Sequence, residues 1–422
     1  MNEQRAGDAG DPPPYGSARD LPSFREMSQL VKGATFLTRF FARHLRPQLL
    51  DIERELNRLG ALVDRFYERL GPRNWIFHDA LPVDEIEQLL AEAPDPDTAE
   101  KRLIELYRRD EFFTWRLQRL YTHEGLSTRR RQIERALEHY GASEFDSCVF
   151  HLIAVMDGFV NDFEAENRKG LHAREPIEMA AWDSIVGHHQ GFSRAMETFG
   201  VTVKKRIDTE VFELCRNGIM HGMVVNFDNE VVATKAWNML FAVADWATAT
   251  TKAAEPQEPK PTWREALASI KRNAEARKRD EQHVEQTIEH SDARFAADEA
   301  VLQAKCFLEA WERRQWGIVT EFMPPVLRER RTNGQAISET KSWFGPHEIT
   351  AWSITSVTHL LPGAADICGI ATVDDEQCDM KFRMVHLDPE GDRAPREIAD
   401  ARWHVGIWAP QRYFEPVTDD TA

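Results

Sequence analysis

The chain has 422 residues, of which 42% are hydrophobic and 29% are charged. This balance is typical of a folded globular protein and excludes a wholly disordered or fibrous chain. At roughly 100–200 residues per domain, the length predicts two to four domains. Because the net charge of −17 repels polyanions at long range, any site for nucleic acid has to be a local one.

We expect a cytoplasmic protein without a membrane partner. No stretch approaches the ~20 consecutive apolar residues of a membrane-spanning helix, and the first residues lack the apolar core of a signal peptide. The five cysteines are widely spaced and form no CxxC pair, which favours reduced thiols in the core over disulfides or a zinc site. Neither a metal nor a cofactor is expected.

The first part of the chain is expected to be a disordered tail followed by helices. Residues 1–20 contain three consecutive prolines and few apolar groups, so burial cannot offset the entropy lost on ordering. Across residues 21–126, apolar residues recur at steps of three and four, most regularly over 49–70. Two shorter helices are expected after Pro82 and after Pro94. The whole N-terminal region is therefore predicted to be helical.

A second all-helical region is expected over residues 127–250, with five helices. The first two begin at patterns typical of N-caps, a serine placed just before a helical run. The last is almost entirely apolar, which predicts a buried helix. The expected helix starts are, in chain order, Ser127, Ser143, Glu175, Asp208 and residue 231.

The remaining residues change in character twice. A proline-rich linker and a highly charged helix, reaching to His290, are expected over residues 251–296. Residues 297–412 begin with an aromatic-rich helix and then alternate apolar with polar residues, which predicts an α+β domain with a curved antiparallel sheet. Residues 413–422 are expected to be a tail. The expected strands are 349–359, 367–373, 380–384 and 401–407.

The most specific local signal is Cys215-Arg-Asn-Gly-Ile-Met-His-Gly222. On the expected helix, Asn217 and His221 stand four residues apart on one face, so that the amide can orient the imidazole. The guanidinium of Arg216 can hold a phosphate, and an imidazole, with its ordinary pKa of about 6.5, can move a proton. These groups suffice for phosphodiester transfer without a metal, and two copies across a C2 dimer would supply both acid and base.

Other interpretations of these residues stay open. Arg216 and His221 can instead mark a helix end with a capping arginine and a satisfied histidine, although we favour the site. Asp157 interrupts an apolar helical face and can tune the imidazole, or it can be a structural carboxylate. Basic clusters at 129–131 and 204–206 can dock RNA or be solvated faces.

A second RNxxxH sequence occurs earlier in the chain, at Arg73-Asn-Trp-Ile-Phe-His78. It follows a Gly-Pro pair and precedes Pro82, so it lies outside any expected helix. We interpret it as a coincidence or a buried contact.

Arg216, Asn217 and His221 fit the R-x4-6-H motif of the HEPN superfamily (higher eukaryotes and prokaryotes nucleotide-binding), and residues 127–250 resemble its helical domain. The resemblance implies a helical bundle that forms homodimers through the motif face. It also implies a metal-independent endoribonuclease in which an RNA 2′-hydroxyl attacks the adjacent phosphate, and a role as a toxin or in defence against phage.

The start of the C-terminal region, from Phe307 to Trp316, has the pattern F-x-x-A-W-x4-W and resembles the NTF2-like superfamily. The resemblance implies a pocket that binds a small ligand, catalyses a reaction or mediates dimerisation. Four residues can line it or be ordinary cross-strand partners: His359, His386, His404 and Trp343.

Two hypotheses follow for the whole chain. The first is a homodimeric ribonuclease, in which Arg216, Asn217, His221 and Asp157 form the site and RNA is bound locally. The second is a catalytically silent dimeric scaffold, whose C-terminal domain binds a small ligand or a partner protein.

Overall fold

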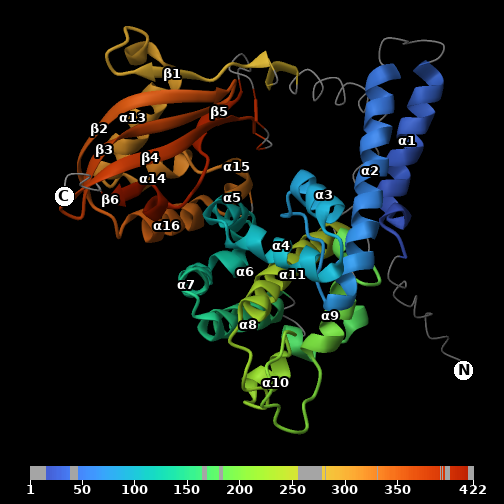
Figure 1. Ribbon diagram of the computed structural model, residues 1–422. Coiled ribbons are helices and arrows are strands. Elements are labelled where there is room, and N and C mark those ends of the chain that lie inside the picture. The colour runs from blue at the N-terminus through green and yellow to red at the C-terminus, as the bar shows by residue number, and fades with distance from the viewer. Residues whose placement is uncertain are drawn as a thin grey trace, which may run out of the picture. The chain divides into compact units, whose positions relative to one another are not determined.

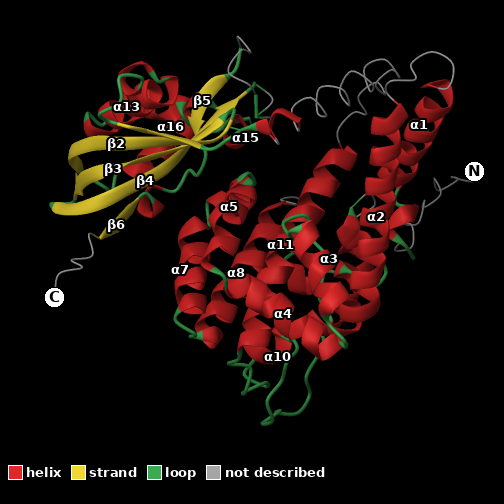
Figure 2. Cartoon of the chain, turned by 45° about the horizontal axis from the view of Figure 1, so that its top comes forward, coloured by secondary structure: helices red, strands yellow, loops and turns green. Residues whose placement is uncertain are grey.

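The computed structural model describes residues 16–38, 46–163, 169–179, 184–254, 278–280, 282–329, 331–389, 391, 393–394 and 400–416. The chain divides into two compact units, Met1–Leu267 and Ala268–Ala422. Figures 1 and 2 show that the first unit is helical and that the second contains an antiparallel sheet. The predicted change from helices to an α+β region is therefore confirmed. Among the described residues, no helix is long and apolar enough to cross a membrane.

The N-terminal helices follow the predicted pattern closely. The helix expected over 49–70 is present, and so are those after Pro82 and Pro94. The aromatic residues after the third helix belong to a separate one, because the backbone of Arg109 is extended. The helices are α1 (Pro22–Thr38), α2 (Arg46–Leu70), α3 (Val83–Glu92), α4 (Pro96–Arg108) and α5 (Asp110–Tyr121).

The disordered tail expected over residues 1–20 is wrong for its last residues. Residues 1–15 lie outside the described residues, but Ala18–Asp20 form a 3-10 helix, η1. Asp64 of α2 accepts hydrogen bonds from the hydroxyl of Ser17 (2.7 Å) and from the backbone N–H of Ala18 (2.9 Å). A single carboxylate thus fixes Ser17 and Ala18 on α2.

The second half of the helical unit is built around one buried helix. In α11, every residue from Val232 to Ala247 is buried, as its apolar sequence predicts. Helix α8 packs on both α7 and α11. The helices of this half are α6 (Glu124–Ser127), α7 (Arg130–Gly141), α8 (Phe145–Phe163), α9 (Phe192–Phe199), α10 (Arg216–Met220) and α11 (Glu230–Ala254).

Several details predicted for this half are wrong. Ser127 ends α6 instead of capping α7, whose N-cap is Arg129. Ser143 precedes α8 in a left-handed conformation, with φ 62°. The helix expected from Glu175 is a 3-10 turn, Pro176–Met179, and α9 was not expected. A capping pattern is only a few residues long, and the side chains of Ser and Thr can also form hydrogen bonds with nearby backbone outside a helix. Such a pattern therefore does not fix where a helix begins.

Residues 75–79, which lie outside the helices and strands, join the two halves through hydrogen bonds with polar side chains of α11. The amide of Asn238 accepts from the N–H of Ile76 (2.9 Å) and donates to its carbonyl (2.8 Å). The carboxylate of Asp245 accepts from the N–H of Asp79 (2.7 Å). The two helical regions expected from the sequence, 21–126 and 127–250, therefore share one core.

The C-terminal unit has a six-stranded antiparallel sheet in the order β1-β2-β3-β4-β5, with β6 also paired to β4. The four expected strands are confirmed, while β1 and β6 were not expected. The tail expected over 413–422 is wrong at β6, which pairs with β4. The strands are β1 (Gln286–Glu289), β2 (Ile349–Leu361), β3 (Ala364–Val373), β4 (Glu376–Leu387), β5 (Arg402–Val405) and β6 (Phe414–Pro416).

Helices cover part of this sheet and complete its core. Helix α13 packs on β2 and β3, and its Phe307 contacts Phe344 of α16 and Phe382 of β4. The expected aromatic-rich helix is thus present. The helices are α13 (Glu299–Glu312), α14 (Trp316–Glu321), α15 (Pro325–Arg328) and α16 (Asn333–Phe344).

The predicted charged helix is wrong at its C-terminal end. Its linker and first part, 255–277, lie outside the described residues, but Gln286–Glu289 form the edge strand β1. Only Ile288 of this strand is buried, and an edge strand tolerates the charged neighbours that suggested a solvated helix.

All five cysteines are free, but only Cys148 is buried. The expectation of core thiols therefore holds for that residue alone.

Candidate functional site

The Arg216–His221 motif lies on the short helix α10, among loops at one end of the helical unit (Figure 1). His221 is the C-cap residue, and Gly222 follows with φ 67°. The N–H of Met223 donates to the carbonyl of Gly218 (2.8 Å), which closes a Schellman turn. The helix ends at the motif because glycine adopts the left-handed conformation that this turn requires.

The longer helix expected from Asp208 to this motif is wrong, because tertiary contacts hold the preceding residues in another conformation. The carbonyl of Phe212 accepts from Nζ of Lys235 (2.7 Å). The carboxylate of Glu213 accepts from Lys235 (3.1 Å) and from the amide of Asn74 (2.7 Å). These partners lie far away in the sequence, so local periodicity could not reveal them.

Arg216 is held in a fixed orientation by Asp157 of α8. Its Nε and Nη2 atoms donate to the same carboxylate oxygen, Oδ2, at 3.0 and 2.8 Å. Both side chains are largely buried, with exposed fractions of 13% for Arg216 and 17% for Asp157. A guanidinium has five N–H groups, and Nη1 uses one more for Asn217 (3.1 Å). Two N–H groups therefore remain for an anion such as a phosphate, counting contacts with the described residues.

The structure does not place the amide of Asn217 against the imidazole of His221. The Nδ2 atom of Asn217 donates to the carbonyl of Gly200 (2.8 Å), and its Oδ1 accepts from Arg216. The side chain of His221 is exposed and makes no hydrogen bond or ion pair with residues that the structure describes. Asn217 thus positions the arginine, and the imidazole is left open to solvent.

Asp157 faces a different histidine, which the sequence analysis did not single out. Its second oxygen, Oδ1, accepts from the backbone N–H of His172 (3.0 Å) and lies 3.1 Å from Nδ1 of the same residue. His172 belongs to the 3-10 turn Leu171–Ala173, η4, and its side chain is 41% exposed. No sequence motif marks this position. The only signal was Asp157 itself, a carboxylate in an apolar helical face.

The earlier RNxxxH sequence has quite different surroundings. Arg73 forms ion pairs with Asp97 and Glu100 of α4. His78 is fully buried, and its Nε2 lies 2.5 Å from the hydroxyl of Tyr107. Burial, with a smaller contribution from the positive charge of nearby Arg119, holds the pKa of His78 well below its ordinary value. The interpretation of this copy as a buried contact is therefore confirmed.

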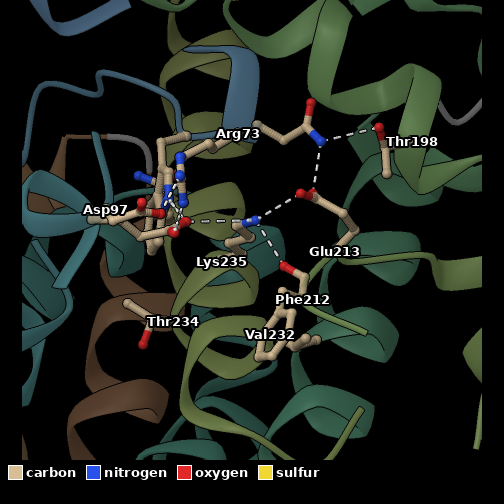
Figure 3. A network of polar contacts seen from close by, with 12 residues as sticks. Arg73, Asp97, Thr198, Phe212, Glu213, Val232, Thr234 and Lys235 are labelled. Atoms are coloured by element: carbon tan, nitrogen blue, oxygen red, sulfur yellow. Dashed lines mark hydrogen bonds and ion pairs between the residues drawn. The ribbon is translucent and has the colours of Figure 1, made fainter. Parts of the chain in front are cut away.

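A polar network surrounds this first copy (Figure 3). Lys235, whose side chain is 3% exposed, lies between Glu213 and Glu100, with Nζ 3.1 and 3.8 Å from their carboxylates. The amide of Asn74 links Glu213 to the hydroxyl of Thr198 (3.1 Å). The network connects α4, α9 and α11, so its chemistry is that of an internal structural tie.

In the C-terminal unit, only one of the four candidate pocket residues lines the cavity described there. His359 faces a cavity of about 670 Å³, and its Nε2 lies 2.9 Å from the carboxylate of Asp298. His386 and His404 bond to backbone carbonyls, and Trp343 is buried. No cluster of His, Cys, Asp or Glu that could hold a metal ion occurs within the described parts of either unit.

Comparisons of the chain with known protein families, with curated protein sequences and with solved structures found no match. The function is therefore argued from the chemistry of the site. Its defined elements are an arginine anchored by Asp157, an exposed histidine that ends the same short helix, and a second histidine on the same carboxylate.

Proposed function

We propose that this protein is a metal-independent endoribonuclease of the HEPN type, with Arg216 and His221 at its site. The observation that carries the proposal is the fixed orientation of the arginine together with the exposure of the histidine. Asp157 fixes the guanidinium while two of its N–H groups stay available, and the imidazole at the other end of α10 is exposed. A bare surface arginine would lack this orientation.

The proposed reaction is the transfer of an RNA phosphate to its own 2′-hydroxyl. Attack by this hydroxyl builds negative charge on the non-bridging phosphate oxygens, and the free N–H groups of Arg216 stabilise that charge. The imidazole of His221 transfers a proton in the same step. The products are a 2′,3′-cyclic phosphate and a free 5′-hydroxyl.

Cations near the motif support local binding of RNA in a chain that is acidic overall. Lys204 and Lys205 are exposed. They precede Ile207, which forms a parallel bridge with Val224, just beyond α10. Two lysines in the same part of the fold as Arg216 can contact phosphates that flank the cleaved one. This placement favours RNA docking over a purely solvated face.

The remaining parts of the proposal concern assembly and context. Two copies associate through the face that carries α10, and the C-terminal unit has the NTF2-like architecture, with its cavity as a ligand site. A toxin or phage-defence role predicts that expression of the protein arrests growth and that His221→Ala abolishes the arrest. Size-exclusion chromatography with light scattering tests the dimer.

The test of the activity is a cleavage assay on total RNA and a tRNA pool with excess chelator. The wild type should cleave and leave 2′,3′-cyclic phosphate ends, while His221→Ala and Arg216→Ala should each lose about 100-fold or more. His189→Ala, which changes an exposed histidine elsewhere in the unit, is the matched control and should cleave like the wild type.

A wild type that cleaves no RNA, or variants that cleave as fast as the wild type, would contradict the proposal. In that case the pair of Asp157 and Arg216 is a structural tie between α8 and α10. The chain would then be a silent scaffold, and the C-terminal cavity at His359 would be its binding site.

A further inference from the structure

One carboxylate connects the guanidinium of the motif to a histidine outside it. Oδ2 of Asp157 accepts twice from Arg216, and Oδ1 accepts from His172. A carboxylate only accepts hydrogen bonds, so Nδ1 of His172 carries the hydrogen and its Nε2 is unprotonated in the neutral ring. That Nε2 makes no hydrogen bond with any residue that the structure describes, and the side chain is partly exposed.

We propose that His172 is the general base of the reaction and that His221 is its general acid. This inference rests on the proposed ribonuclease function. An aspartate that accepts a hydrogen bond from the Nδ1–H group fixes the tautomer and stabilises the imidazolium that forms when Nε2 takes a proton. His221 has no such partner among the described residues, and its exposed imidazole is the group assigned to proton donation.

The step balances with these two groups alone. Nε2 of His172 takes the proton of the 2′-hydroxyl while the 2′-oxygen forms a bond to phosphorus. The bond from phosphorus to the 5′-oxygen breaks, and His221 gives its proton to that oxygen. The histidines finish with exchanged protonation states, and proton exchange with water restores them.

The same geometry places the phosphate clamp and the base in one chain. Arg216 and His172 bind opposite oxygens of a single carboxylate, so they lie within a few ångströms of it. Gly170 contributes to this closeness, because a Cβ at that position would lie 3.2 Å from Nδ1 of His172. The group that holds the phosphate and the proposed base therefore come from the same chain.

A substrate with sulfur in place of the bridging 5′-oxygen separates the two roles, because a thiolate leaves without being protonated. On ordinary RNA, His172→Ala and His221→Ala should each lose about 100-fold. On the 5′-thio substrate, His221→Ala should recover to within about tenfold of the wild type, and His172→Ala should stay slow. His189→Ala should match the wild type on both substrates.

A second variant separates catalysis from a structural role. His172→Gln keeps an N–H group that can donate to Asp157 but has no group that accepts a proton at this position, so it should be as slow as His172→Ala. If His172→Gln cleaves like the wild type, the hydrogen bond to Asp157 is what matters, and the assignment as base is wrong. Thermal unfolding of both variants establishes that they fold.

The remaining outcomes separate a failure of this inference from a failure of the proposed ribonuclease function. If the wild type does not cleave, the proposed function fails, and this inference fails with it. If His221→Ala is slow and His172→Ala is not, the inference alone is overturned. Mixing the two alanine variants should restore no activity when one chain supplies both groups, and restored activity would show a site shared between chains.

Discussion

Arg73–His78 and Arg216–His221 contain the same three motif residues at the same spacing, and the chain treats them in opposite ways. The first histidine is fully buried, with its pKa held low by burial, while the second is exposed at the end of a helix. The first arginine pairs with two carboxylates of α4, and the second shares one carboxylate with another histidine. The motif letters therefore specify neither the exposure nor the partners on which chemistry depends.

The largest effect on stability is expected where the network around the first copy is cut. Lys235→Met removes a buried cation between Glu100 and Glu213, and leaving their charges without this partner should cost about 3–5 kcal/mol of unfolding free energy. Lys252→Met changes an exposed lysine of the same helix and should change stability by less than about 0.5 kcal/mol. Urea unfolding measures both, and equal effects would contradict the structural role of the network.

The two histidines should separate stability from activity. His78→Ala leaves a cavity beside Tyr107 and should lower the unfolding free energy by about 2–4 kcal/mol. His221→Ala removes an exposed side chain and should leave stability within about 0.5 kcal/mol of the wild type while cleavage is lost. A destabilised His221→Ala protein would mean that this histidine, too, is structural.

The dependence of stability on pH should reveal the buried groups around the first copy. Burial, with the nearby charge of Asp79, raises the pKa of Asp245 to about 7. A carboxyl that binds its proton more tightly in the folded state loses stabilising effect as the pH rises from about 4 to 7. His78, with its lowered pKa, acts in the opposite direction, because its contribution falls as the pH drops below about 6.5.

Asp245→Asn removes the contribution of Asp245 to the pH dependence of stability and keeps that of His78. Between pH 6.5 and 5, the unfolding free energy of the variant should therefore decline on acidification more steeply than that of the wild type. Asp84→Asn, which changes an exposed carboxylate, serves as the control. Parallel curves for the wild type and Asp245→Asn would show that Asp245 is ionised normally in the folded protein.

The smallest predicted effect concerns the turn that ends α10. Gly222→Ala forces a Cβ into a left-handed conformation with φ 67° and should cost about 1 kcal/mol, while Gly222→Asn should cost less. Space is not the reason, since a Cβ there would meet no atom within 4 Å. Thermal unfolding of the two variants checks this order. The reverse order would mean that the turn tolerates alanine.

Long segments with a regular apolar pattern were predictable because burial follows that pattern. Helix α2 buries the apolar residues of its C-terminal half, α11 is buried on all sides from Val232 to Ala247, and burial alternates along most of β4. The short elements were not predictable. The backbone before α10 follows contacts with Lys235 and Asn74, and β1 is a strand because β2 pairs with it.

The candidate site was predictable only in part. The sequence pointed to Arg216 and to Asp157, and the structure brings the two together. The expected contact between Asn217 and His221 depended on a longer helix, and Gly222 and the loop contacts replaced that helix. His172 lay beyond sequence reasoning, because a turn with no motif brings it to Asp157.

The side-chain amide that binds the backbone of Ile76 makes the N–H of this residue a probe of local unfolding in the helical unit. Ile76 lies outside every helix and strand, yet its N–H is bonded to the buried side chain of Asn238. In hydrogen exchange, this proton exchanges when residues 75–78 separate from α11, because its hydrogen bond is to a side chain of α11 and not to backbone. The exchange rate of this one proton would therefore measure how often the N-terminal helices detach from α11.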